Sequence, residues 1–302
     1  MMIFRAVMEA NTLTQAARAM SLSQPGVSKS VRDIEGLLGF PLFRRQSGRL
    51  TPTKEARALY GNVLVALRGM DSVSRAAENY RDARSGYVRI AATATLAHSL
   101  VPPAIEDFRR RRPAARVVLY TGINHEVVRM VADLEADFGL VLMPTNHAGT
   151  EGRDLCAARL KAVMPAGHPL CALETVGPHD LKPYPLVSYS RTQPIGLEID
   201  EQFRQAGIER QIAIEIIQSA TACSIVAAGA GVAVVDGYSL VNGAFPDLEV
   251  RPFMPAVDVV ARILMPPAQE PTRLARAFLH VLEETAAKAV QTGLMTSASG
   301  ST

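Results

Sequence analysis

Residues 12–53 read TLTQAARAMSLSQPGVSKSVRDIEGLLGFPLFRRQSGRLTPT, and this stretch predicts two crossing helices followed by a β-hairpin. Thr12 and Gln15 form a capping-box pattern, which begins a short helix over residues 13–20. The inner positions of this helix are small, which lets a second helix cross it closely: Ala16, Ala17 and Ala19. Residues 21–22 supply the turn, so the pair is a predicted helix-turn-helix.

The second helix carries side chains that suit a DNA groove. Ser23 caps its start, and Gly39 is a plausible stop at its end. Apolar residues recur at helical spacing on the buried face: Val27, Val31, Ile34 and Leu38. The other face offers partners for bases and phosphates near the N-terminal end of the helix: Gln24, Ser28, Lys29 and Arg32. Residues 42–51 read as a hairpin with Ser-Gly at its tip, where Arg49 could enter the neighbouring minor groove.

The same stretch resembles the N-terminal signature of LysR-type transcriptional regulators, SQPxVSxxIxxLE…LGxxLFxR…LTPxG. The chain matches it with SQPGVSKSVRDIEGLLGFPLFRR and LTPT. The resemblance implies a winged helix-turn-helix over residues 1–58 and DNA contacts at six positions: Gln24, Pro25, Ser28, Lys29, Arg32 and Arg49. Within the family, TPTKEA at 51–56 and FRAVMEA at 4–10 look most like regulators of opine and amino-acid catabolism. The chain departs from the pattern at residues 1–3, so either the true start codon lies upstream of Met1 or the first helix is short.

Charge is divided unevenly along the chain. Residues 1–85 hold 13 Lys and Arg against 7 Asp and Glu, while the remaining residues hold 19 against 22. The basic end therefore carries the helix-turn-helix, as contacts with DNA phosphates require. The alternative is that a small basic domain merely keeps its surface solvated.

Cysteine usage and hydropathy point to a soluble cytoplasmic protein. Cys156, Cys171 and Cys223 are odd in number and widely spaced, which predicts a reducing compartment without a disulfide framework. They show no metal-ligand spacing, although a redox-sensing thiol stays open as an alternative. We see no signal peptide, and the longest apolar run, 225–235, is too short to span a bilayer.

A long helix is predicted over residues 55–84, which contain no proline. Apolar side chains recur there at steps of four and three: Leu59, Val63, Ala66, Met70, Val73, Ala77 and Tyr80. Such a stripe favours a partner helix, although packing on its own domain is the alternative. By resemblance, residues 59–85 are the linker helix that joins chains into a homodimer or homotetramer, so that two recognition helices meet one interrupted palindrome.

From residue 86 the pattern changes to alternating strands and helices, which predicts a parallel sheet covered by helices. We expect strands at 88–92, 115–120 and 138–143, with one helix over 96–111. A second set begins near residue 160, where AGHPL at 166–170 resembles an element of LysR-type effector domains. These domains are similar to type 2 periplasmic solute-binding proteins, so the resemblance implies two α/β lobes with a cleft between them. The expected bounds are 86–160 with 266–290 for lobe I, 161–265 for lobe II, and a disordered tail at 291–302.

An effector in such a cleft should meet strand ends and helix N-termini, which favour anions. Thr95 is the leading candidate for an effector carboxylate, and Thr93 is second. Asn124 should cap the second helix of lobe I. The equivalent positions in lobe II are Ser188, Ser190, Ser219 and Thr221. Asp236 ends a strand and could pair with an effector amino group, although capping or a solvated loop explains any one of these residues equally well.

The sequence thus predicts a DNA-binding transcriptional regulator controlled by a small molecule, with no cofactor and no metal. RNA polymerase is a further candidate partner. We find no nucleophile, base and orienting group that could form an active site, so an enzyme fused to a DNA-binding domain lacks support. Two rival interpretations are a solute-binding protein with an incidental helical N-terminus and a regulator that binds no effector.

Overall fold

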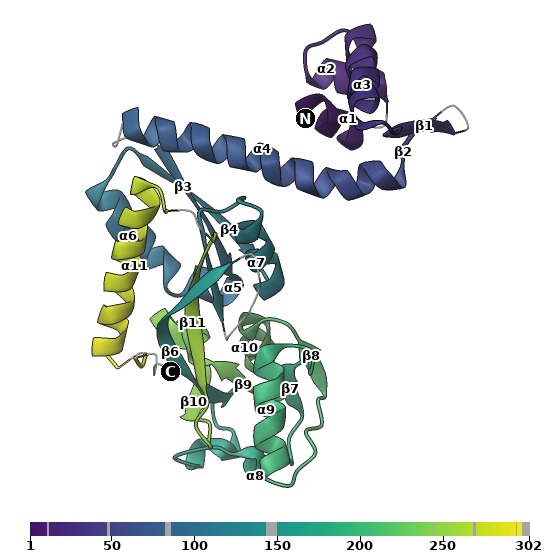
Figure 1. Cartoon of the computed structure of the whole chain (residues 1–302). Coiled ribbons are helices and arrows are strands. Elements are labelled where there is room, and N and C mark those ends of the chain that lie inside the picture. The colour runs from purple at the N-terminus through teal and green to yellow at the C-terminus, as the bar shows by residue number, and fades with distance from the viewer. Residues whose placement is uncertain are drawn as a thin grey trace. The chain divides into compact units, whose positions relative to one another are not determined.

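The computed structural model describes residues 1–302 except 11, 47–48, 82–85, 143–149, 244, 268–269, 294 and 298–302. The chain divides into two compact units, Met1–Glu78 and Asn79–Thr302 (Figure 1). The first unit contains α1 (Met2–Glu9), α2 (Leu13–Ala19), α3 (Gln24–Leu38), β1 (Phe43–Gln46), β2 (Arg49–Pro52) and most of α4 (Lys54–Arg81).

The predicted helix-turn-helix is confirmed down to its caps. The Thr12 hydroxyl accepts a hydrogen bond from Gln15 N at 3.2 Å, and the Ser23 hydroxyl accepts one from Gly26 N at 3.3 Å. Gly39 ends α3 in the left-handed conformation with φ of 77°, which glycine adopts without strain. Strands β1 and β2 pair antiparallel from Phe43–Pro52 to Gln46–Arg49, and the predicted tip, 47–48, lies outside the described residues.

Two small apolar clusters hold the N-terminal unit together. One joins Val7 of α1 to Ala16 and Ala17 of α2 and to Val27 and Val31 of α3. The other joins Phe4, Leu42, Ala56, Val63 and Leu67. Helix α1 contributes to both clusters, so the short first helix is a structural part of this unit.

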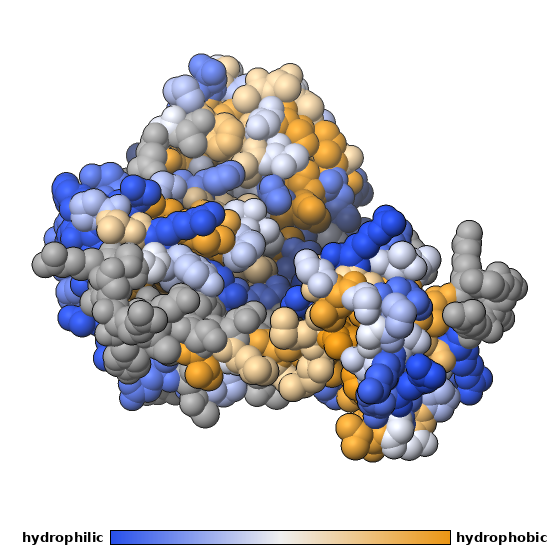
Figure 2. Space-filling model, turned by 90° about the horizontal axis from the view of Figure 1, so that it is seen from above, coloured by the Kyte–Doolittle hydropathy of each residue, from blue (hydrophilic) through white to orange (hydrophobic). Residues whose placement is uncertain are grey.

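The predicted apolar stripe of α4 is partly buried in its own unit and partly exposed. Val63 is buried in its own unit, whereas Met70 and Val73 are 57% and 70% exposed. The side chains of Ala77 and Tyr80 lie outside the described part of the chain. In Figure 2, hydrophobic residues lie among hydrophilic ones on the surface of the molecule. Three large hydrophobic side chains of α4 are exposed: Val65, Met70 and Val73. This segment is free to pack against another helix.

The second unit contains a mixed sheet flanked by helices (Figure 1). Its strands are β3 (Gly86–Thr93), β4 (Ala115–Gly122), β5 (Phe138–Leu142), β6 (Glu151–Pro165), β7 (Leu186–Tyr189), β8 (Ile214–Ile216), β9 (Val232–Asp236), β10 (Leu248–Pro252) and β11 (Asp258–Met265). Its helices are α5 (Ala94–His98), α6 (Val101–Arg111), α7 (Asn124–Ala132), α8 (Pro178–Leu181), α9 (Pro194–Gln205), α10 (Ser219–Ala227) and α11 (Arg273–Gln291), with 3₁₀ turns η1 (Pro169–Ala172) and η2 (Gly237–Gly243).

The described strands follow the order β4-β3-β5-β11-β6-β9-β7-β8, with β10 beside β6. Pairing is parallel within each lobe, as predicted, for β3 with β4 and β5 and for β7 with β8 and β9. The 15-residue β6 crosses between the lobes, because its first half pairs with β11 and its second half with β9 and β10. Strand β11 pairs with β5, so residues 258–265 belong to the sheet of lobe I and not to lobe II as expected.

Two expectations about elements are wrong in the second unit, and one strand was not foreseen. The helix expected over 96–111 is interrupted, since Pro102 and Pro103 lack the N–H groups that a continuous helix needs and instead lie in the first turn of α6. Strand β10 was not expected. The expected disordered tail contains an ordered part, because Met295 is 5% exposed and Thr296 bridges to Ala157 of β6.

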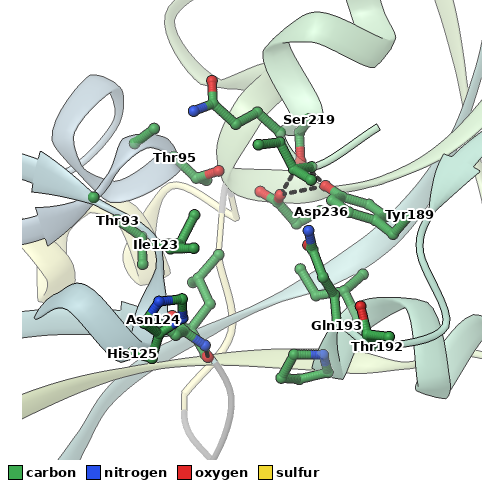
Figure 3. Close-up of a pocket in the computed structure, with 17 residues that line it drawn as sticks. Thr93, Thr95, Ile123, Asn124, His125, Tyr189, Thr192, Gln193, Ser219 and Asp236 are labelled. Carbon is green, nitrogen blue, oxygen red and sulfur yellow. Dashed lines mark hydrogen bonds between the residues drawn. The ribbon is translucent and has the colours of Figure 1, made fainter. Parts of the chain in front are cut away.

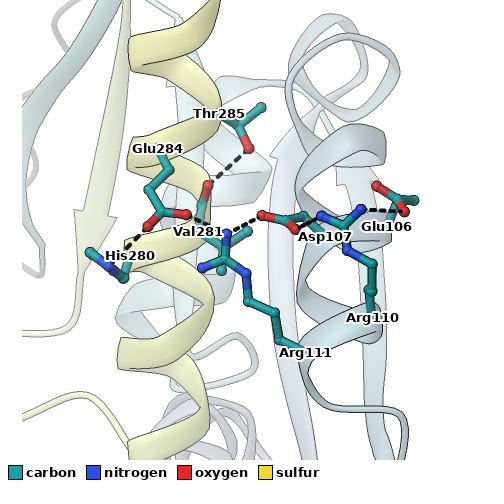
Figure 4. A network of polar contacts seen from close by, with 8 residues as sticks. All are labelled: Glu106, Asp107, Arg110, Arg111, His280, Val281, Glu284 and Thr285. Carbon is teal, nitrogen blue, oxygen red and sulfur yellow. Dashed lines mark hydrogen bonds and ion pairs between the residues drawn. The ribbon is translucent and has the colours of Figure 1, made fainter.

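Helices α6 and α11 are joined by a polar network (Figure 4). The buried Asp107 carboxylate accepts hydrogen bonds from Arg110 and Arg111, and Arg111 also donates to Glu284 of α11 at 2.6 Å. His280 lies 3.2 Å from the same Glu284. One residue of the basic run at the end of α6, Arg111, thus links two helices of lobe I.

Candidate DNA interface and effector cavity

The predicted DNA-contacting side chains of α3 lie on one accessible surface. Gln24, Pro25, Lys29 and Arg32 are exposed and Ser28 is half-buried, while Val27 and Val31 of the same helix are buried. The helix therefore offers hydrogen-bonding and cationic groups outward from its N-terminal half, as a helix that enters a major groove must. Arg49 begins β2 next to the wing tip, and its side chain lies outside the described residues.

Two residues that the sequence analysis missed fix the wing to the recognition helix. The Glu35 carboxylate on α3 accepts hydrogen bonds from Leu42 N at 2.7 Å and Phe43 N at 3.0 Å. The Thr53 hydroxyl lies within hydrogen-bonding distance of Leu42 O and accepts a bond from Ala56 N, so it also caps α4. These contacts set the direction of the hairpin relative to α3. Glu35 occupies the position of E in the LE pair of the signature, so the sequence could have indicated that this residue matters.

The second unit has a cavity of about 170 Å³ between its lobes (Figure 3). Lobe I supplies the end of β3 and the starts of α5 and α7, and lobe II supplies the ends of β7 and β9 and the starts of α9 and α10. In Figure 3, Thr93, Thr95, Asn124 and His125 lie on one side and Tyr189, Ser219 and Asp236 on the other. The volume suits a small metabolite.

One wall of the cavity is rich in hydrogen-bond donors. Thr93 is 8% exposed, and its hydroxyl has no hydrogen-bond partner in the part of the chain that the structure describes. Three longer helices begin at the cavity with N-cap residues that make no side-chain cap: Ile123 of α7 on this wall, and Gln193 of α9 and Gln218 of α10 on the wall of lobe II. Their first-turn N–H groups and positive dipole ends favour an anion. The Thr93 hydroxyl is an unsatisfied polar group in the same wall, and in this structure it is buried beneath the cavity surface.

The opposite wall contains a buried carboxyl group, Asp236. Its oxygens accept hydrogen bonds from the hydroxyls of Ser219, Tyr189 and Ser239 and from Ser239 N. All of these donors are neutral, and burial raises the pKa of Asp236. Burial and the nearby Asp236 also raise the pKa of Tyr189 well above its ordinary value. A cation in the cavity would stabilise the ionised form of Asp236.

Five of the eight predicted effector residues line this cavity: Thr93, Thr95, Asn124, Ser219 and Asp236. Asn124 does not cap α7 as expected. Ile123 is the N-cap residue, and the Asn124 amide instead donates to Leu142 O at 2.7 Å and accepts from Leu142 N. Asn124 therefore ties α7 to the end of β5, which shapes the cavity wall.

The other three predicted effector residues do not line the cavity. Ser188 is buried and accepts a hydrogen bond from Arg210, and Ser190 bonds within its own loop to Thr192. Helix α10 begins at Ser219, two residues earlier than expected, which leaves Thr221 exposed on its surface.

Several cavity residues were not predicted. Ile123, His125, Thr192, Gln193 and Ile217 line it, each next to a helix start or strand end. The loop before α9 packs closely on the helix, since a Cβ on Gly196 would lie 2.0 Å from Ser190 O. The glycine at 196 could have indicated this close approach. Sequence spacing alone does not show which way side chains at turns point, so the lining residues there could not be predicted.

Among the described residues, no group of three or more His, Cys, Asp or Glu could hold a metal ion. Burial raises the pKa of the Cys156 thiol to about 11 and that of Cys223 to about 12. Both thiols are therefore unreactive near neutral pH.

Within the described part of the chain, every helix is too short or too polar to cross a bilayer.

Comparison with known proteins agrees with this architecture. The family described as bacterial regulatory helix-turn-helix protein, lysR family, matches residues 1–57, and the LysR substrate binding domain matches 81–287. The transcriptional activator protein LysR of Escherichia coli (strain K12) is 31% identical over 276 residues, which cover 91% of this chain and 89% of that protein.

One further relative and one solved structure are also similar to this chain. The octopine catabolism/uptake operon regulatory protein OccR of Rhizobium meliloti is 29% identical over 84% of each chain. The crystal structure of CbnR, a LysR family transcriptional regulator, has the same fold, with a TM-score of 0.69 at 20% identity over 94% of this chain and 97% of that one. The chain therefore belongs to the LysR family of DNA-binding transcriptional regulators, whose members are not enzymes and which join a helix-turn-helix to an effector-binding domain.

Proposed function

We propose that this regulator binds an operator as a homodimer or homotetramer and responds to a small effector that carries both a carboxylate and an amino group. The observation that carries the effector class is the pairing of the orphan Thr93 hydroxyl on one cavity wall with the buried Asp236 carboxyl on the other. The protein would work in the cytoplasm, where the DNA that it binds lies.

The DNA contacts that we propose are Gln24, Pro25, Ser28, Lys29 and Arg32 on α3, together with Arg49 in the wing. The exposure of the described α3 side chains supports this assignment. Lys29 and Arg32 can neutralise phosphates or donate to guanine, and Gln24 can read a base edge. The exposed Met70 and Val73 on α4 support pairing of two chains, which would present two α3 helices to one interrupted palindrome.

The effector's carboxylate would lie at the donor wall. The Thr93 hydroxyl and the N–H groups of Asn124 and His125 would supply donors there, beside the Glu126 carboxylate that already accepts a hydrogen bond from Ile123 N, and Thr95 lines the same side. The amino group would lie toward Asp236, either directly or through the Ser219 hydroxyl that bonds to it. Each charge of the ligand then meets a complementary group in a site of low dielectric.

The name of the relative OccR supports the same class. It is a regulator of octopine catabolism and uptake by its description, and opines are amino-acid derivatives. Binding would draw the two lobes together across β6 and β11. This can change DNA binding or promoter activation only if the effector has different affinity for two arrangements of the lobes.

Thermal unfolding of the full-length protein with and without amino acids tests the proposed effector class. A true effector at a hundred times its Kd stabilises the protein by about 2.7 kcal/mol, so the Tm rises with concentration. Matched carboxylic acids without the amino group and amines without the carboxylate should give smaller shifts. Equal shifts for the acids alone would contradict the role of Asp236, and no shift for any amino compound would overturn the effector class.

A further inference from the structure

A second chamber of about 90 Å³ adjoins the effector cavity. The two share the residues Ala94, Thr95 and Gln218 in their walls. The volume of the second chamber is about three times the volume of about 30 Å³ that a water molecule occupies in the liquid, so it has room for a short arm of a ligand. It lies between α5 of lobe I and the α10 and η2 segments of lobe II.

The walls of this chamber differ from those of the first cavity. Ala220, Val241 and Phe245 make much of the lining apolar. Tyr238 offers its ring and not its hydroxyl, which donates to Cys156 O at 2.8 Å. The Ser239 hydroxyl is likewise engaged with Asp236. An aliphatic chain would lose little hydration of polar groups by entering this space.

The polar groups that remain are suited to a hydrogen-bond acceptor. Gln218 and Thr95 lie where the chambers meet and His98 lies in the second chamber, and the side chains of all three can donate hydrogen bonds. No carboxylate lines this chamber among the described residues, and the Asp236 carboxyl behind Ser239 is buried and already accepts hydrogen bonds from three hydroxyls and a backbone N–H. The chamber therefore favours a chain that ends in a carboxylate, amide or hydroxyl.

We propose that this chamber is an accessory subsite for an extended side arm of the effector, aliphatic along its length and ending in a hydrogen-bond acceptor. The inference rests on the proposed function, in which the amino and carboxylate groups occupy the first cavity. The effector is then larger than a simple short-chain amino acid. Ala220, Val241 and Phe245 select it by the length and polarity of its arm.

Binding of three probes to the full-length protein by calorimetry tests this subsite. L-alanine has no arm, L-2-aminoadipate has an aliphatic arm ending in a carboxylate, and L-lysine has one ending in an ammonium. Each buried methylene raises affinity about fourfold, so two buried methylenes should make L-2-aminoadipate bind at least about tenfold tighter than L-alanine. L-lysine should bind more weakly than L-2-aminoadipate, because the chamber lacks an acidic group.

Substitutions at two alanines of α10 locate the effect. Ala220→Leu fills the chamber and should remove the advantage of L-2-aminoadipate while leaving L-alanine binding unchanged, since Ala220 does not line the first cavity. Ala227→Leu adds the same side chain at an exposed position of the same helix and should behave as the wild type. Val241→Phe fills the chamber from η2 and replaces Ala220→Leu if that variant unfolds at a lower temperature.

The outcomes separate this subsite from the proposed function. Equal affinity for L-alanine and L-2-aminoadipate, preference for L-lysine, or an unchanged arm effect in Ala220→Leu would overturn the subsite and leave the proposed effector class standing. If none of the three probes binds the wild type, the proposed effector class fails and the subsite fails with it.

Discussion

Thr93→Val should separate effector binding from stability. The substitution keeps the shape of the side chain and replaces a buried hydroxyl, which lacks a partner among the described residues, with a methyl group; the whole residue is 8% exposed. A buried unsatisfied polar group is unfavourable by about 1–3 kcal/mol, so its removal should leave the free energy of unfolding unchanged or raise it. A hydrogen bond to a charged ligand contributes about 1.5–3 kcal/mol, so effector affinity should fall about tenfold to a hundredfold.

Thr53→Val is the matched control, because Thr53 has the same exposure of 8%. Its hydroxyl bonds to Leu42 O at 3.1 Å and accepts from Ala56 N at 3.1 Å, so this variant should lose about 1–3 kcal/mol of stability in its own unit and keep effector affinity. Thermal unfolding and calorimetry on both variants measure the two effects. A Thr93→Val protein that is clearly destabilised, or that binds its effector as tightly as the wild type, would refute the reasoning.

Four further predictions concern the rest of the molecule. Lys29→Ala should weaken operator binding about tenfold or more in mobility-shift assays and reduce its salt dependence, whereas Lys182→Ala, at another exposed lysine, should not. Glu35→Ala should lower the unfolding free energy of the N-terminal unit by about 2–4 kcal/mol in urea, because two backbone N–H groups lose a charged acceptor; an unchanged midpoint would contradict this. Because burial raises the pKa of Asp236 in the folded state, the wild type should gain stability relative to Asp236→Asn as pH falls toward the ordinary carboxyl pKa of about 4, and a pH-independent difference would count against it. Val73→Asp should reduce the oligomer mass in light scattering, while Leu197→Asp, at an exposed apolar site of the other unit, should leave it unchanged.

Local signals made the N-terminal unit predictable. Thr12, Ser23 and Gly39 act within a few residues of themselves, so their capping roles follow from spacing and chemistry alone, and the structure has all three. Glu35 acts across seven residues on the backbone of Leu42. Its role depends on how the wing folds back, which spacing does not specify.

The location of the effector cavity was predictable from the sequence, but the full set of residues that line it was not. Thr93, Thr95 and Asp236 stand at strand ends or the following helix start, and topology brings such positions together in an α/β fold. Thr221 and Asn124 were misplaced because each depends on the residue at which a helix begins, and helix starts are uncertain by one or two positions. Ser188 was misinterpreted because its partner, Arg210, is distant in sequence.

The lobe boundary could not be read from local pattern. Strand β11 follows lobe II in the chain, yet its alternating apolar residues pair with β5 of lobe I. Short strands such as β10 contain too few residues to show a clear alternation of apolar and polar side chains. The two prolines at 102–103, by contrast, were a readable signal for the break between α5 and α6.

Selection of sheared genomic DNA from the source organism by the purified full-length protein tests the central claim most directly. We expect that a small set of fragments is enriched, that these share an interrupted palindrome, and that Lys29→Ala loses the enrichment while Lys182→Ala keeps it. Recovery of fragments in proportion to their abundance, with no sequence preferred over random duplex at moderate ionic strength, would contradict it.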